Sequence, residues 1–230
     1  MSAIVVDRLE AHLDISELLN SVIPLFDKYP PQYRSPAFGG WSLQSNTGSY
    51  SQGWTQDFVP YNGPNNLGPS WSPKSKLESG LHTVQNSMVP TEMMTEPFQK
   101  LIDKLEALHL NPRRARIVRI MPGNSTVWHI DGSSRFYQVR LCIPLLTNPH
   151  CFFENEQGRY HMKADGALYF THINKMHRAA NFGETERFQF ICHVWDQDHI
   201  TQFHRYDPAE NPGESHHLDE VDLNSQYKRN

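Results

Sequence analysis

Hydrophobic residues recur at helical spacing in two stretches of the N-terminal half of the chain. The first stretch follows Asp14, which with Glu17 resembles a capping box, and Pro24 is expected to kink or end this helix. The second stretch begins at Pro97, whose missing N–H costs nothing in the first turn of a helix. The apolar stripes are Ile15, Leu18, Leu19, Val22 and Phe26 in the first stretch, and Phe98, Leu101, Ile102, Leu105 and Leu108 in the second. Each predicted helix has one apolar face, which indicates packing against the outside of a sheet.

The chain from residue 115 to residue 196 follows a different pattern, with short strands separated by turn residues. Besides a first strand at 4–6, the pattern predicts strands over 115–121, 126–131, 136–143, 151–154, 159–162, 167–171 and 187–195. In the run 136–143, Arg140 and Cys142 share one face, and the other face carries Val139, Leu141 and Ile143. A series of short strands of this kind predicts a mainly β protein whose strands close into a small barrel.

These patterns divide the chain into three parts. Residues 1–114 are predicted to form a helical and loop extension packed on the barrel, 115–196 the barrel core, and 197–230 a polar tail. Within the first part, the segment 44–71 is rich in small and polar residues yet holds Trp54 and other aromatic side chains, which a disordered linker would lack. Two interpretations of this segment stay open. It forms part of the substrate pocket wall, with Trp54 reaching the substrate, or it is a structural plug at the base of the barrel.

Composition narrows the classes of function. A chain of 230 residues with 38% hydrophobic and 11% aromatic residues is typical of a single globular domain. The net charge of −4 argues against a nucleic-acid partner, which requires a basic excess. Three cysteines without C-x-x-C spacing indicate neither a disulfide framework nor a zinc site. No signal peptide is recognisable and no apolar run approaches the roughly 20 residues of a membrane span, so we expect a cytoplasmic protein without a membrane partner.

The candidate chemistry lies between Trp128 and Arg187. His129 and Asp131 are two positions apart, so on an extended strand both side chains point the same way. His177 can join them if the chain folds back as antiparallel sheet, and two imidazoles with one carboxylate suit Fe(II) with open coordination positions. An H-x-D pair alone is a weak signal in a chain with 13 histidines. Arg187, ten positions after His177, adds a guanidinium that can bind a carboxylate through two parallel hydrogen bonds.

The order of motifs after residue 139 is more specific. The chain carries Arg140-Leu141-Cys142-Ile143-Pro144-Leu145-Leu146-Thr147-Asn148-Pro149, then Tyr160-His161-Met162, then His177-Arg178-Ala179-Ala180-Asn181-Phe182-Gly183, and then Arg187. In these motifs, over roughly residues 115–196, the chain resembles the aspartyl/asparaginyl β-hydroxylase family, which includes bacterial proline hydroxylases. It departs from many relatives at Cys142, where they carry a histidine.

The resemblance implies a fold, a reaction and a set of site residues. The implied fold is a double-stranded β-helix, a jelly-roll or cupin-like barrel, buttressed by the N-terminal helices. The implied activity is that of an Fe(II)- and 2-oxoglutarate-dependent dioxygenase that uses O₂, with His129, Asp131 and His177 as iron ligands and catalytic centre. Arg187 would hold 2-oxoglutarate and Arg140 would line the same pocket. The implied reaction hydroxylates an unactivated C–H bond of an amino acid, free or within a peptide, while 2-oxoglutarate is decarboxylated to succinate.

Four residues are candidates for contact with the substrate. They are Trp54, Arg119, Arg135 and His193. The two arginines flank the ligand strand, where each can meet a substrate carboxylate or simply lie on the surface. Two other classes of function also stay open. One is a barrel that binds a metal or small ligand without catalysis, and the other is a cupin-type hydrolase or isomerase that uses the same histidines without a keto acid.

Overall fold

The computed structural model describes residues 6–35, 37–51, 87–129, 139–156, 158–173 and 176–194. Its helices are α1 (Ile15–Phe26) and α5 (Glu96–Ala107). Its strands are β1 (Val6–Leu9), β2 (Gln32–Ser35), β3 (Phe38–Ser42), β4 (Gln44–Ser45), β5 (Val89–Pro90), β6 (Pro112–Ile120), β7 (Asn124–Ser125), β8 (Val139–Leu146), β9 (Cys151–Asn155), β10 (Gly158–Tyr160), β11 (Leu168–His172), β12 (His177–Asn181) and β13 (Arg187–Val194).

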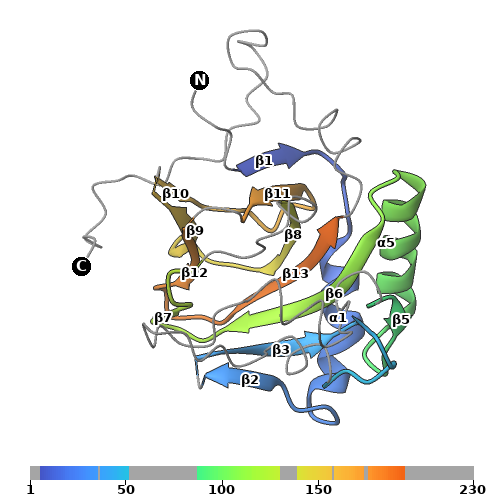
Figure 1. Cartoon of the computed structure of the whole chain (residues 1–230). Coiled ribbons are helices and arrows are strands. Elements are labelled where there is room, and N and C mark those ends of the chain that lie inside the picture. Colours follow the sequence, from blue (N-terminus) through green and yellow to red (C-terminus); the bar gives the residue numbers. More distant parts are fainter. Residues whose placement is uncertain are drawn as a thin grey trace, which may run out of the picture.

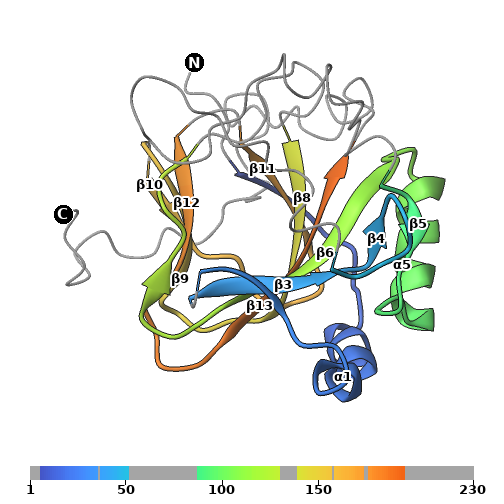
Figure 2. The ribbon, with the colours of Figure 1, turned by 60° about the horizontal axis from the view of Figure 1, so that its bottom comes forward.

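Two antiparallel sheets face each other and form the body of the molecule (Figure 1). The large sheet has the strand order β1-β11-β8-β13-β6-β3-β2, and the small sheet has the order β10-β9-β12-β7. Both helices pack on the outer side of the large sheet, away from the small sheet (Figure 2). Strands β1, β2 and β3 come from the segment predicted as an extension packed on the barrel, so that segment also contributes strands to the large sheet.

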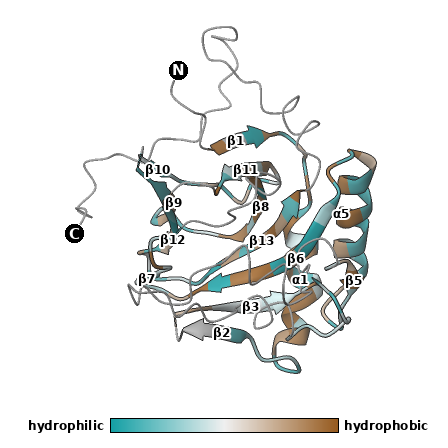
Figure 3. Cartoon of the chain, in the orientation of Figure 1, coloured by the Kyte–Doolittle hydropathy of each residue, from teal (hydrophilic) through white to brown (hydrophobic). Residues whose placement is uncertain are grey.

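The two predicted helices are confirmed. The Asp14 carboxylate accepts a hydrogen bond from the Glu17 backbone N–H at 2.8 Å, which caps α1 at its first turn. Pro24 does not end α1 at once, because the helix continues for two more residues to Phe26 and then stops. In α5, Pro97 lies in the first turn as expected. Polar and apolar residues alternate along α5 in Figure 3, and its apolar stripe faces the sheet.

The large sheet is buried on both faces, so two hydrophobic clusters lie on its two sides. The outer cluster joins the helices to alternate residues of the central strands, among them Trp41, Ile117, Leu141 and Phe190. The inner cluster lies between the sheets and includes Val118, Cys142, Tyr169 and Ile191 of the large sheet with Phe153 and Met162. Val139, Leu141 and Ile143 belong to the outer cluster and Cys142 to the inner one, which confirms the predicted alternation in this strand.

The strand predicted over 126–131 is wrong in its first half. Regular pairing ends at Ser125, and the next backbone bridge is the isolated one between His129 and His177. The Ala179 N–H donates to the side-chain hydroxyl of Thr126 at 3.0 Å, so the threonine side chain occupies a position in the ladder that a backbone carbonyl would otherwise take. Residues 130 and 131 lie outside the described ranges.

Gly166 connects the start of α1 to the turn before β11. Its φ is +84°, and its carbonyl accepts a hydrogen bond from the Leu13 N–H at 3.1 Å. A Cβ at this position would stand 2.5 Å from the Leu13 carbonyl oxygen. Gly123 also has a positive φ, +71°, but a Cβ there would meet nothing within 4 Å. A side chain at Gly166 would meet both backbone strain and steric overlap, whereas a side chain at Gly123 would meet backbone strain alone.

We expect Gly166→Ala to lower the free energy of unfolding by about 3–4 kcal/mol, since it combines left-handed strain with overpacking. Gly123→Ala carries the strain alone and should cost about 1–2 kcal/mol. Urea unfolding of both variants measures the difference. If both variants lose the same free energy of unfolding, the backbone at Leu13 moves away from the added Cβ of residue 166 at no cost.

Candidate active site

The two candidate histidines lie side by side. The His129 and His177 backbones exchange hydrogen bonds of 3.0 and 2.9 Å, and their ring centroids are 4.4 Å apart. His177 opens β12 and is buried, with the Phe153 ring stacked on it at 5.3 Å. The sheet therefore brings together two imidazoles from distant parts of the chain. This is the pairing that a shared metal ion requires.

The ring of His129 is oriented by a hydrogen bond to the backbone two residues earlier. Its Nδ1 lies 2.7 Å from the Val127 carbonyl oxygen, a contact in which Nδ1–H donates. In that tautomer the Nε2 atom carries a lone pair, which is the form that binds a metal. The donor set fits Fe(II) in this respect, because imidazole nitrogen is one of the ligands of non-haem iron.

The third predicted ligand, Asp131, lies outside the described residues, as do the substrate candidates Trp54 and Arg135. Within the described ranges, no group of three or more histidine, cysteine, aspartate or glutamate side chains is arranged to hold a metal ion. The assignment of His129, Asp131 and His177 as one ligand set stays a prediction.

Arg187 is a buried cation at the first residue of β13, with a side chain only 4% exposed. Its Nη1 donates to the backbone carbonyls of Phe152 at 3.1 Å and Ala180 at 3.2 Å, and its Nη2 donates to the side-chain oxygen of Gln189. Among the described residues no carboxylate forms an ion pair with it. Burial lowers the pKa of Arg187 from its ordinary value. A guanidinium in this setting is stabilised by an anionic ligand, and a carboxylate matches its planar fork.

The register places Arg187 and His177 toward opposite ends of the interior. Arg187 reaches the carbonyl of Ala180, three residues beyond His177 on β12, a separation of about 10 Å along a strand. We call the end with His129 and His177 the ligand end and the end with Arg187 the anchor end. A short dicarboxylate bound to a metal at the ligand end can extend toward Arg187.

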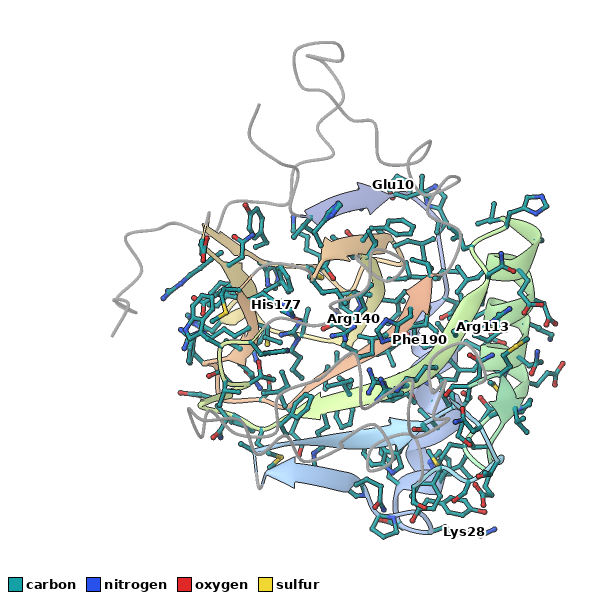
Figure 4. The ribbon with its side chains drawn as sticks, in the orientation of Figure 1. Glu10, Lys28, Arg113, Arg140, His177 and Phe190 are labelled. Atoms are coloured by element: carbon teal, nitrogen blue, oxygen red, sulfur yellow. The ribbon has the colours of Figure 1, made fainter. Side chains whose placement is uncertain are left out.

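Three basic side chains of the large sheet share its inner face, toward the end of β13 away from Arg187. Arg140 on β8 is paired with His193 on β13, and Arg116 on β6 is paired with Ile191 of the inner cluster. Arg116 and His193 are buried. In Figure 4, Arg140 on the large sheet and His177 on the small sheet lie on the two sides of the interior. Sequence reasoning had selected Arg140 and His193 but missed Arg116, although it alternates with Val118 and Ile120.

Cys142 lies on this inner face. It pairs across the sheet with Ile191 and Tyr169 and is buried. Burial raises the pKa of the Cys142 thiol, while Arg140, the Thr171 hydroxyl and Arg187 act in the opposite direction. The residue therefore stays a neutral thiol at neutral pH and adds an apolar surface to the interior.

Arg119, a substrate candidate from the sequence, does not face the interior. It pairs across the sheet with Phe188, a member of the outer cluster, and its Nη2 forms an ion pair with Glu186. Side chains alternate along β6, so Arg116 and Val118 point inward where Arg119 points outward.

Comparison with known proteins identifies the family to which the chain belongs. Residues 46–197 match the family model described as Aspartyl/Asparaginyl beta-hydroxylase. The chain belongs to this family. As a member of the aspartyl/asparaginyl β-hydroxylase family, the protein is an Fe(II)- and 2-oxoglutarate-dependent dioxygenase, with Fe(II) as its cofactor and 2-oxoglutarate and O₂ as co-substrates. A search of curated protein sequences finds no match.

Solved structures of similar fold share little sequence with this hydroxylase family member. The non-haem α-ketoglutarate-dependent epimerase SnoN from nogalamycin biosynthesis is 10% identical, with a TM-score of 0.50 over 84% of this chain and 78% of that one. A 2OG-Fe(II) oxygenase family oxidoreductase from Burkholderia pseudomallei is 15% identical, with a TM-score of 0.44 over 83% of this chain and 84% of that one. A prolyl hydroxylase from Trichoplax adhaerens, in complex with a hypoxia inducible factor peptide, is 12% identical, with a TM-score of 0.45 over 86% of each chain.

The predicted fold class is confirmed. The two facing antiparallel sheets form the double-stranded β-helix expected of a family member, with α1 and α5 buttressing the large sheet. In the part of the chain that the structure describes, no helix is both long and apolar enough to cross a membrane.

Arg187→Lys keeps the positive charge but loses the planar fork. We expect the dissociation constant of 2-oxoglutarate to rise roughly 10- to 100-fold, the equivalent of about 1.5–3 kcal/mol for a charge-assisted hydrogen bond. The affinity for Fe(II) alone should change little. Anaerobic titration with 2-oxoglutarate measures this, and Arg119→Lys on the outer face is the matched control that should bind as the parent does. Equal weakening in both variants would remove Arg187 from the keto-acid site.

Proposed function

We propose that the protein hydroxylates an unactivated C–H bond of an amino acid, free or as a residue of a peptide, and converts 2-oxoglutarate to succinate and CO₂. The observation that carries this proposal is Arg187, a buried guanidinium bonded only to carbonyl and amide oxygens of the described residues. Its guanidinium binds a carbonyl about 10 Å along β12 from His177, a span that a metal-bound dicarboxylate can bridge. Neither a non-catalytic barrel nor a cupin-type hydrolase requires a cation at that place.

The proposed roles of the residues follow from the two ends of the interior. At the ligand end, Nε2 of His129 and an imidazole nitrogen of His177 hold Fe(II), and Asp131 supplies the carboxylate on the strength of its spacing from His129. At the anchor end, Arg187 holds the 5-carboxylate of 2-oxoglutarate. When bound, Fe(II) and 2-oxoglutarate activate O₂ for insertion into the C–H bond. The protein positions these groups and excludes water by packing Phe153 and Met162 between the sheets.

The substrate is proposed to carry a carboxylate. Arg116, Arg140 and His193 share the inner face of the large sheet, opposite His177, and basic side chains on neighbouring strands favour an anionic ligand. Arg140 also lines the 2-oxoglutarate site by resemblance, so Arg116 and His193 are the residues that we assign to the substrate. Trp54 and Arg135 remain proposed substrate contacts on the strength of the sequence alone.

Iron binding tests the metal site directly. His177→Ala should weaken Fe(II) binding and remove turnover, since the proposed site then keeps two of its three protein ligands. Anaerobic addition of Fe(II) and 2-oxoglutarate to the parent should give the visible charge-transfer band of a keto acid chelated to iron. That band separates the oxygenase from both alternatives, because a hydrolytic cupin binds no keto acid and a non-catalytic barrel needs none. If His177→Ala binds Fe(II) as tightly as the parent, the histidine is not a ligand.

The substrate's carboxylate is tested with pairs of amino acids and their carboxamides. The parent should convert the acid with the higher kcat/KM, measured as succinate released and hydroxylated product formed. Arg116→Gln is expected to lose about 10-fold or more on the acid while the amide changes little, since the charge-assisted hydrogen bond is worth about 1.5–3 kcal/mol. Arg119→Gln, on the outer face of the same strand, is the control. A parent that does not distinguish acid from amide would exclude a carboxylate site.

A further inference from the structure

The outer face of the small sheet carries a group of side chains directly behind the two histidines. Trp128 immediately precedes His129, and Arg178 immediately follows His177. Neighbouring residues of an extended chain point to opposite faces, so these two side chains meet outside the barrel while the histidines meet inside. The Arg178 guanidinium lies 5.0 Å from the centroid of the Trp128 ring.

Arg178 is held in place by a buried carboxylate. Glu154, its cross-strand partner on β9, is only 2% exposed, and one carboxylate oxygen forms an ion pair with the Arg178 Nε. The other oxygen forms an ion pair with the Nε of Arg159, the partner of Glu154 on the opposite side. With both oxygens engaged, the carboxylate has one orientation, and so does the guanidinium that lies on Trp128. We call Glu154, Arg178 and Trp128 the outer brace.

The stretch that leads into His129 lacks regular strand pairing over residues 126–128. Regular pairing ends at Ser125, and the Val127 side chain is largely exposed. Trp128 is 36% exposed, so packing covers only part of the ring. Thr126 is held to the small sheet by hydrogen bonds with Ala179, and His129 by its backbone bridge to His177. Between these two attachments, the contact between Arg178 and Trp128 adds a side-chain link next to the ligand position.

We propose that Arg178, oriented by Glu154, is a positioning residue for the metal site. By fixing Trp128 it fixes the register of His129 against His177, and with it the separation of the two imidazoles. This role rests on the proposed function, because it presumes that both histidines bind Fe(II). Loss of a group that hydrogen-bonds a metal ligand weakens metal binding by roughly 10- to 100-fold. Arg178 acts one contact further out, so we expect the lower end of that range.

The decisive comparison uses the two arginines that share Glu154. Arg178→Gln should weaken Fe(II) binding about 10-fold in anaerobic titration and alter the position or width of the Fe(II)–2-oxoglutarate charge-transfer band. Arg159→Gln removes an equivalent ion pair of Glu154 but does not touch Trp128, so it should keep the parent's iron affinity and band. Urea unfolding of the metal-free variants shows whether the two lose similar stability, which separates a metal effect from a folding effect.

Trp128→Leu tests the same contact from the other side and leaves the Glu154 ion pairs intact. It removes the aromatic face that Arg178 contacts and should reproduce the loss of iron affinity of Arg178→Gln. The double variant should be no weaker than either single variant, since both changes break one contact.

The outcomes distinguish this inference from the function on which it rests. If the parent shows no Fe(II) binding or no charge-transfer band, the proposed function fails and the positioning role fails with it. If the parent behaves as expected but Arg178→Gln and Trp128→Leu both bind iron as the parent does, the outer brace alone is refuted. Equal weakening by Arg178→Gln and Arg159→Gln would also refute it, because the ion pairs then only stabilise the small sheet.

Discussion

The guanidinium of Arg187 connects the two sheets in the interior. A cation with so little exposure requires polar partners, and it finds them in the carbonyls of Phe152 and Ala180 on the small sheet and in Gln189 on its own strand. Strand β13 pairs with both β6 and β8 at the centre of the large sheet, so the position of Arg187 is itself held by two neighbours. One side chain therefore links the best-anchored strand of one sheet to the backbone of the other.

The two ends of the interior are held with different rigidity. At the anchor end, Arg187 pairs with Ile120 of β6 and its side chain binds carbonyls of the regular strands β9 and β12. At the ligand end, His177 belongs to a regular strand, whereas His129 lies at an isolated backbone bridge that follows the two hydrogen bonds between Thr126 and Ala179. The outer brace lies where that attachment is weakest. A metal site needs each ligand held in place by supporting contacts, and the outer brace can supply one for His129.

Much of this architecture could be predicted from the sequence where the pattern is local. Helices α1 and α5 follow from the apolar stripes and the residues at their first turns, since capping and periodicity act within a few positions. The alternation in β8 was predicted from the two-residue period of an extended strand. In the structure each face of β8 is buried in a different hydrophobic cluster. The strand over 126–131 was predicted too long, because the hydroxyl of Thr126 takes a ladder position, and that competition depends on Ala179, far along the chain.

The sequence by itself determined the chemical family and the candidate residues His129, Asp131, His177 and Arg187, because spacing and residue type survive without knowledge of the fold. Only the tertiary structure decided which arginines share the interior. Arg116 and Arg119 are three positions apart on one strand, and the pairing of β6 with β13 turns the first inward and the second toward Glu186. The contact of Arg178 with Trp128 and Glu154 likewise depends on strand register. Register follows from burial across the whole sheet, which local sequence does not encode.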